Sequence, residues 1–134
     1  MSSNITIFLM KNDGEFKFMK INPDYTKIVK LLGLDFNDDY IKDTYVMING
    51  LRYTMYSKEG YPTKESKITA TDIERKIFVL NTFILIRENK NHFFFDMNTS
   101  NMNDIKSRLK FPKDKKKRFT GEDYLFSKII LELD

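Results

Sequence analysis

Two runs rich in apolar residues near the start of the chain predict a β-hairpin over residues 5–22. Its two strands flank Asp13-Gly14, a pair that favours a two-residue type I′ turn. Such a turn places Phe8 opposite Met19 on one face, with a second apolar pair on the other face. Because both faces are apolar, we expect a helix to cover one of them and a second sheet or a partner chain to cover the other.

The same kind of pattern predicts a second hairpin over residues 45–56, whose strands flank Asn49-Gly50. A two-residue turn pairs Ile48 with Leu51 and brings mostly apolar side chains onto one face. The opposite face carries Arg52 and a threonine, so we expect that face to be in contact with water.

Helical spacing and capping residues predict two to three helices. Asn22-Pro23 is a favourable start for the first helix, with the asparagine as N-cap, and Gly33 is a natural end. Apolar residues three and four positions apart predict a short helix over residues 100–110 and an amphipathic C-terminal helix over residues 120–134. Further strand-like runs lie at residues 77–80, 83–86 and 93–96.

These elements predict a single α+β domain over residues 1–134. Its mainly antiparallel sheet is built from two β-hairpins plus later strands, with two to three helices packed on it. A chain of 134 residues with 41% hydrophobic residues suits one domain with its own core. A basic linker, residues 110–119, is expected before the C-terminal helix. There is no apolar run long enough to cross a bilayer and no secretory leader, so we expect a cytoplasmic protein with no membrane partner.

Residue usage indicates the kind of genome that encodes the protein, and the distribution of charge indicates where its surface is basic. Lysine, isoleucine and asparagine are abundant and alanine occurs once, as is typical of proteins from AT-rich genomes such as those of low-GC bacteria, their phages and large DNA viruses. The net charge is +4. Residues 1–105 carry 14 basic and 14 acidic side chains, whereas residues 106–118 carry eight basic side chains and one acidic side chain. The positive excess therefore belongs to one short segment.

This basic segment is the first candidate binding site. Its charge, next to Phe111 and Phe119, can attract phosphates by counterion release while the rings stack on exposed bases. An acidic protein surface is a second interpretation, and a solvated linker in a lysine-rich protein is a third. Lysine outnumbers arginine in the segment, which disfavours base-specific readout. The residues concerned are Lys106, Arg108, Lys110, Lys113, Lys115, Lys116, Lys117 and Arg118.

Aromatic residues form the second candidate. Tyrosine is enriched in interface cores, and Tyr53, Tyr56 and Tyr61 surround the second hairpin. The run at residues 93–95 is expected to belong mostly to the core. Consecutive strand residues face opposite sides, however, so Phe94 points away from its neighbours. If nothing covers Phe94, we expect it to contact a partner or a second copy of the chain.

Signatures of catalysis and metal binding are missing from the sequence. His92 is the only histidine and is expected to be a structural or surface residue rather than a general base. There is no cysteine and no recognisable nucleophile, phosphate-loop or metalloprotease motif. We therefore expect no enzymatic activity, no catalytic residue, no metal site and no cofactor.

The order of features over residues 1–90 resembles a small domain family of unknown function found on phages and plasmids. The shared order is a hairpin, a short helix ending in glycine, a strand, an EEGK-type loop, and a strand after an Asp-Ile step. The matching stretches are residues 5–21, 25–33, 45–56, 57–61 and 72–86. The loop and the step after it differ here, and residues 91–134 have no counterpart. The resemblance implies a mobile-element accessory protein and carries no active site.

From these observations we expect a phage- or virus-encoded accessory protein that binds a host factor by protein–protein contact and modulates or inhibits it, with an anti-defence role. The alternatives are a nucleic-acid-binding protein that uses residues 106–118 and a sponge that sequesters nucleotides. The doubly apolar first hairpin also leads us to expect a homodimer.

Overall fold

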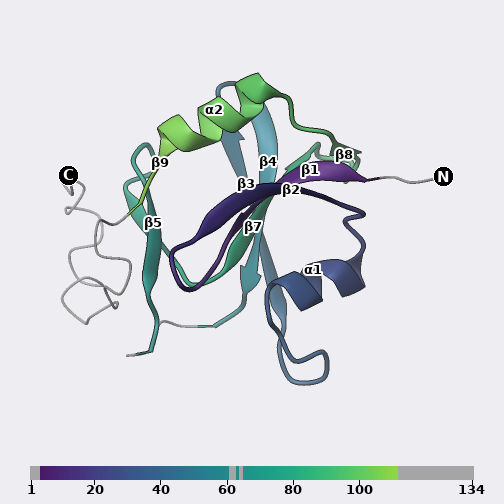
Figure 1. The fold of residues 1–134 in the computed structure, drawn as a ribbon, viewed down its shortest axis with the longest axis vertical. Coiled ribbons are helices and arrows are strands. Elements are labelled where there is room, and N and C mark those ends of the chain that lie inside the picture. Colours follow the sequence, from purple (N-terminus) through teal and green to yellow (C-terminus); the bar gives the residue numbers. More distant parts are fainter. Residues whose placement is uncertain (1–3, 61–62, 64, 112–134) are drawn as a thin grey trace.

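The computed structural model describes residues 4–60, 63 and 65–111, and Figure 1 shows their arrangement. In chain order the elements are β1 (Ile5–Met10), β2 (Phe16–Ile21), α1 (Tyr25–Leu31), β3 (Ile41–Ile48), β4 (Leu51–Lys58), β5 (Ile68–Asp72), β6 (Ile77–Leu80), β7 (Phe83–Glu88), β8 (Phe94–Phe95), α2 (Thr99–Arg108) and β9 (Leu109–Lys110).

The strands form two antiparallel sheets. The larger sheet has the order β2-β1-β7-β4-β3, and the smaller sheet has the order β6-β5-β9. β7 pairs with β1 over residues 83–85 and with β8 over residues 87–88, because β1 diverges from it partway along. α1 covers one face of the larger sheet, and α2 with the smaller sheet covers the other (Figure 1). The α+β prediction with mostly antiparallel strands is confirmed.

The first hairpin forms, but its predicted register is wrong by one residue. Phe8 lies opposite Phe18 rather than Met19. The backbone N–H of Lys11 donates to the carbonyl of Glu15 at 2.8 Å, so three residues make the turn instead of two. Gly14 adopts a φ of 86°, which is typical of a hairpin with a bulge next to a type I turn.

Both faces of this hairpin are covered, as the sequence predicts. On one face, Ile7 packs in a cluster with Ile28 of α1. On the other face, Phe8 packs in a cluster with Val79 of the smaller sheet and Ile105 of α2. The cover comes from the same chain, so the apolar faces of the hairpin no longer argue for a homodimer.

The second hairpin has the predicted register, with Ile48 opposite Leu51. Asn49 and Gly50 adopt φ angles of 49° and 79°, as a type I′ turn requires. The prediction that the face carrying Arg52 and Thr54 is in contact with water is wrong in part. Thr54 is buried, because β4 lies between β3 and β7 and side chains of the neighbouring strands flank it.

The helices begin and end close to the predicted positions. α1 is capped by Asp24, whose carboxylate accepts the backbone N–H of Lys27, and not by Asn22. Gly33 ends α1 in the left-handed region, as predicted. The predicted C-terminal helix from Thr120 lies outside the described residues. Neither described helix is long and apolar enough to cross a membrane.

Candidate functional site

The basic segment does not form one surface over the residues that the structure describes. Lys106 is exposed on α2, with its ammonium 5.8 Å from the ring centre of Phe18, and Lys110 is exposed on β9. Arg108 lies between them and is buried. The remaining candidates, Lys113, Lys115, Lys116, Lys117 and Arg118, lie outside the described residues, as does most of the linker.

Arg108 is part of a buried ion-pair network. Its Nε donates to Oδ1 of Asp72 at 2.6 Å, and one of its terminal nitrogens donates to the carbonyl of Met47 at 2.8 Å. The second oxygen of Asp72 accepts from Nε of Arg75 at 2.6 Å. Arg108 therefore connects α2 to β3 and β5. Its guanidinium is buried and is not exposed for binding nucleic acid or another protein. The sequence shows its charge but not the buried carboxylate that holds it.

The two tyrosines of the predicted surface that the structure describes do not form an exposed surface. Tyr53 is fully buried in the core between the larger sheet, the smaller sheet and α2. Tyr56 is half-buried, and its hydroxyl donates to Oε1 of Glu88 at 2.5 Å. Tyr61 lies outside the described residues.

The phenylalanine run is exposed, and the prediction that it is mostly core is wrong. Phe93, Phe94 and Phe95 have exposed fractions of 64%, 37% and 42%. β8 is only two residues long and extends the end of β7 where β1 has diverged, and none of the three rings belongs to a core cluster. The expected exposure of Phe94 is found, and its two neighbours are exposed with it. We call residues 92–95 the phenylalanine edge.

A shallow cavity of about 460 Å³ lies beside the phenylalanine edge. Phe93 and Phe94 form one side of it, and Ile5 with Pro23 forms another. The remaining lining is polar and consists of Asn4, Asn22, Asp24 and His92. The edge therefore combines protruding rings with a concave surface that is partly apolar and partly polar.

The turn that carries the edge is held by hydrogen bonds. The side-chain oxygen of Asn89 accepts the backbone N–H groups of Asn91 and Phe93, at 2.9 and 3.1 Å. The backbone of Asn89 also exchanges two bonds with the turn, to His92 and Phe93. His92 sits in the left-handed region with a φ of 64°, a conformation that is uncommon without glycine.

Glu88 anchors this turn to the sheet. Its side chain is buried, and Oε2 lies 2.9 Å from Nδ1 of the exposed His92. The other oxygen accepts from Tyr56, and burial together with the Glu88 carboxylate raises the pKa of the Tyr56 phenol well above its usual range. An ionised carboxylate only accepts hydrogen bonds, so Nδ1 of His92 is the donor when it pairs with ionised Glu88. A spacing of four residues was the only sequence signal for this pair.

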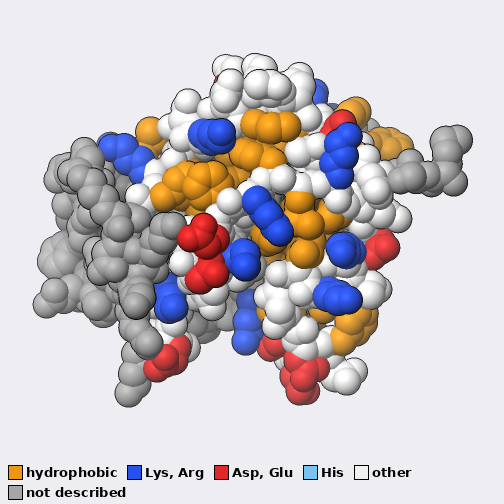
Figure 2. Space-filling model, in the orientation of Figure 1, with side chains coloured by type: hydrophobic (Ala, Val, Ile, Leu, Met, Phe, Trp, Pro, Cys, Tyr) orange, Lys and Arg blue, Asp and Glu red, His pale blue; other side chains and the backbone are white. Residues whose placement is uncertain are grey.

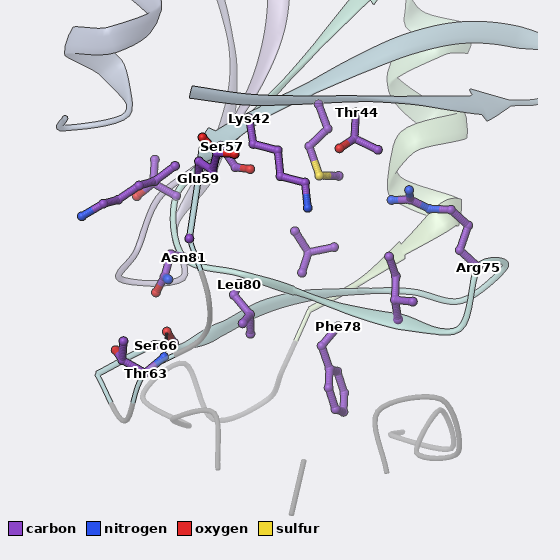
Figure 3. A pocket seen from close by; sticks show the side chains of 16 residues that line it. Lys42, Thr44, Ser57, Glu59, Thr63, Ser66, Arg75, Phe78, Leu80 and Asn81 are labelled. Carbon is purple, nitrogen blue, oxygen red and sulfur yellow. Dashed lines mark hydrogen bonds between the residues drawn. The ribbon is translucent and has the colours of Figure 1, made fainter. Parts of the chain in front are cut away.

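A larger cleft separates the two sheets on the opposite side of the core (Figure 3). Its volume is about 510 Å³. β3 and β4 line one side with Lys42, Thr44 and Ser57, and β6 lines the other with a run of apolar residues at 77–80. The described residues contain no cluster of three or more potential metal ligands at either cavity.

The outer surface does not single out another site on the face in view. Figure 2 shows hydrophobic, basic and acidic side chains interspersed there, without a concentrated field of one sign among the described residues. Comparisons of the chain with protein-family models, with curated proteins and with solved structures find no match.

Proposed function

We propose that this chain is a binding protein that docks onto another protein through the phenylalanine edge. The observation that carries the proposal is the exposure of three consecutive phenylalanines on a hydrogen-bonded turn. Burying a large apolar side chain against a partner contributes about 1.5–3 kcal/mol. Contiguous exposed apolar side chains are therefore favourable in a complex and costly without one.

The anchored turn supports the same proposal. Association is opposed by the entropy lost when flexible side chains and loops become ordered. The bonds from Asn89 and Glu88 order the turn before any partner arrives. A rigid apolar protrusion beside a shallow cavity suits a protein surface with a complementary groove and ridge.

The finer proposal is a phage- or virus-encoded accessory protein that acts in the host cytoplasm. It binds a host factor, a defence component, and inhibits or modulates it by covering part of its surface. The residue usage and the resemblance of residues 1–90 to mobile-element domains support this source. Occlusion needs no catalytic group, which agrees with the expectation from the sequence motifs.

The test compares three forms of the full chain. The wild type, a Phe93→Ser/Phe95→Ser variant, and a control with Phe36→Ser/Tyr40→Ser are used to capture partners from the natural host. The control removes two aromatic side chains that are also exposed, by 58% and 71%, but lie in the link after α1. A captured protein is then purified, and its affinity for all three forms is measured by calorimetry.

We expect the wild type and the control to bind the purified partner alike, and the edge variant to bind at least about tenfold more weakly. Equal affinity of all three forms would show that the edge is not the docking surface. Capture of nuclease-sensitive material, lost on raising the salt from about 50 to 200 mM, would favour the nucleic-acid alternative. Concentration-dependent dimerisation that the edge variant abolishes would identify a second copy as the partner.

A further inference from the structure

The inner face of the larger sheet changes character along β3. Val46 and Ile48 belong to the apolar core, whereas Thr44 and Lys42, further back on the same face, line the cleft between the sheets. On β4, Ser57 lies directly opposite Lys42. This end of the inner face therefore carries an ammonium and two hydroxyls where an ordinary sheet would continue its core.

Lys42 differs from the other two basic residues of the cleft. Lys58 pairs with Asp39 at 3.3 Å, and Arg75 pairs with Asp72 at 2.6 Å. Lys42 points into the cleft in Figure 3, and no carboxylate of the described residues pairs with it. Glu59 is the single acidic residue in the described lining. The lining thus has a positive excess and one ammonium that is available to an anion.

The opposite wall of the cleft is apolar. Phe78 and Leu80 point away from Lys42 in Figure 3, and the alternation of side chains along a strand places Ile77 and Val79 on the side of β6 that faces Lys42. Met55 forms part of the floor beside Thr44. A ligand that fills the cleft meets hydrogen-bond donors on one side and apolar surface on the other.

The size of the cleft suits a small molecule. Its volume of about 510 Å³ lies within the range of roughly 300–1,000 Å³ that is usual for ligand sites. Such sites are mainly apolar with a few polar groups that orient the ligand, which is the division seen here. A ligand with an anionic group at one end and an apolar face at the other matches both walls.

We propose that this cleft binds a nucleoside phosphate. Lys42, Thr44 and Ser57 hold the phosphate by charge-assisted and hydroxyl hydrogen bonds, and the base lies against Ile77 and Val79. The cleft is on the opposite face of the larger sheet from the cavity beside the phenylalanine edge, so this site does not rest on the proposed docking function.

The test is calorimetric titration of the full chain with ATP, AMP, adenosine and inorganic phosphate. We expect ATP and AMP to bind, and adenosine and phosphate each to bind at least about tenfold more weakly, because each lacks one of the two contacts. Phosphate binding as tight as AMP binding would overturn the base contact. The absence of binding by every probe at about 1 mM would overturn the site.

Variants show whether Lys42 holds the phosphate. Lys42→Met keeps the length of the side chain without its charge and should weaken AMP binding at least about tenfold, whereas Lys42→Arg should keep most of the affinity. Lys30→Met, on α1 and away from the cleft, is the matched control and should bind as the wild type does. Both lysines are exposed, so neither substitution should disturb the fold, and thermal melting of the variants checks this. Unchanged affinity in Lys42→Met would contradict the proposal.

Discussion

The buried carboxylate of Glu88 lies 2.9 Å from Nδ1 of His92, the residue that begins the phenylalanine edge. Because the other carboxylate oxygen accepts from Tyr56, Glu88 links an exposed turn to the middle of the sheet. This chain of three side chains crosses from β4 to β7 and then to the turn. A change inside the sheet can therefore reach the proposed docking surface through these three side chains.

Tyr56→Phe should destabilise the fold. The substitution keeps the ring and removes the hydroxyl that donates to the Glu88 carboxylate at 2.5 Å. A hydrogen bond to a charged group contributes about 1.5–3 kcal/mol, so we expect a loss of that size in the free energy of unfolding. Urea denaturation measures it. The exposed Tyr40→Phe is the control, and a Tyr56→Phe variant as stable as that control would show that the bond contributes little.

Arg108→Met should be more damaging, because it leaves Asp72 buried with Arg75 as its remaining cation. Breaking a buried ion pair on one side costs about 3–5 kcal/mol. The loss appears as a lower denaturation midpoint. Lys106→Met, two residues earlier on α2 and exposed, removes only the contact with the Phe18 ring and should change the stability by less than about 1 kcal/mol. Equal midpoints for the two variants would mean that Arg108 does not stabilise the fold.

The stability of the protein should fall in acid partly through Asp72. Burial by itself raises the pKa of Asp72, but the hydrogen bonds from Arg108 and Arg75 outweigh it and hold the pKa below the ordinary aspartate value. Ionised Asp72 therefore stabilises the folded state fully above the unfolded-state pKa of about 3.9. That contribution is lost as the pH falls below this value and through the folded-state pKa.

The corresponding variant is Asp72→Asn, which cannot ionise. It should be less stable than the wild type at neutral pH and should lose less stability between about pH 4 and pH 2. Urea midpoints across this range provide the measurement. A variant curve that runs parallel to that of the wild type would assign the acid sensitivity to other carboxylates.

Gly50→Ala should destabilise the second hairpin through the backbone alone. Gly50 has a φ of 79°, and a Cβ added there meets no atom within 4 Å. The cost is the strain of a left-handed alanine, about 1–2 kcal/mol, observed as a lower melting temperature. Gly50→Asn should cost less, because asparagine tolerates this conformation. A larger loss for asparagine than for alanine would contradict the backbone explanation.

The two hairpins show where sequence reasoning succeeds. Asn49-Gly50 adopts the predicted two-residue turn, and every pair of the second hairpin follows from it. Asp13-Gly14 is a similar signal, but the Asp13 carboxylate accepts the N–H of Glu15 and the turn takes one residue more. The apolar side chains of β2 therefore change partners. A local pattern predicts a turn, and side-chain bonds select its length.

The candidate sites were harder to predict because exposure is a property of the whole fold. The sequence by itself determined the two hairpins, the approximate positions of the two described helices and the need for cover on both faces of the first hairpin, since these follow from local spacing and turn chemistry. It did not predict β5 or β9, which form the smaller sheet with β6. The tertiary structure decided that Arg108 is buried, that Phe93–Phe95 are exposed and that Glu88 anchors His92. These outcomes depend on which segments lie against one another, and spacing along one chain does not specify that.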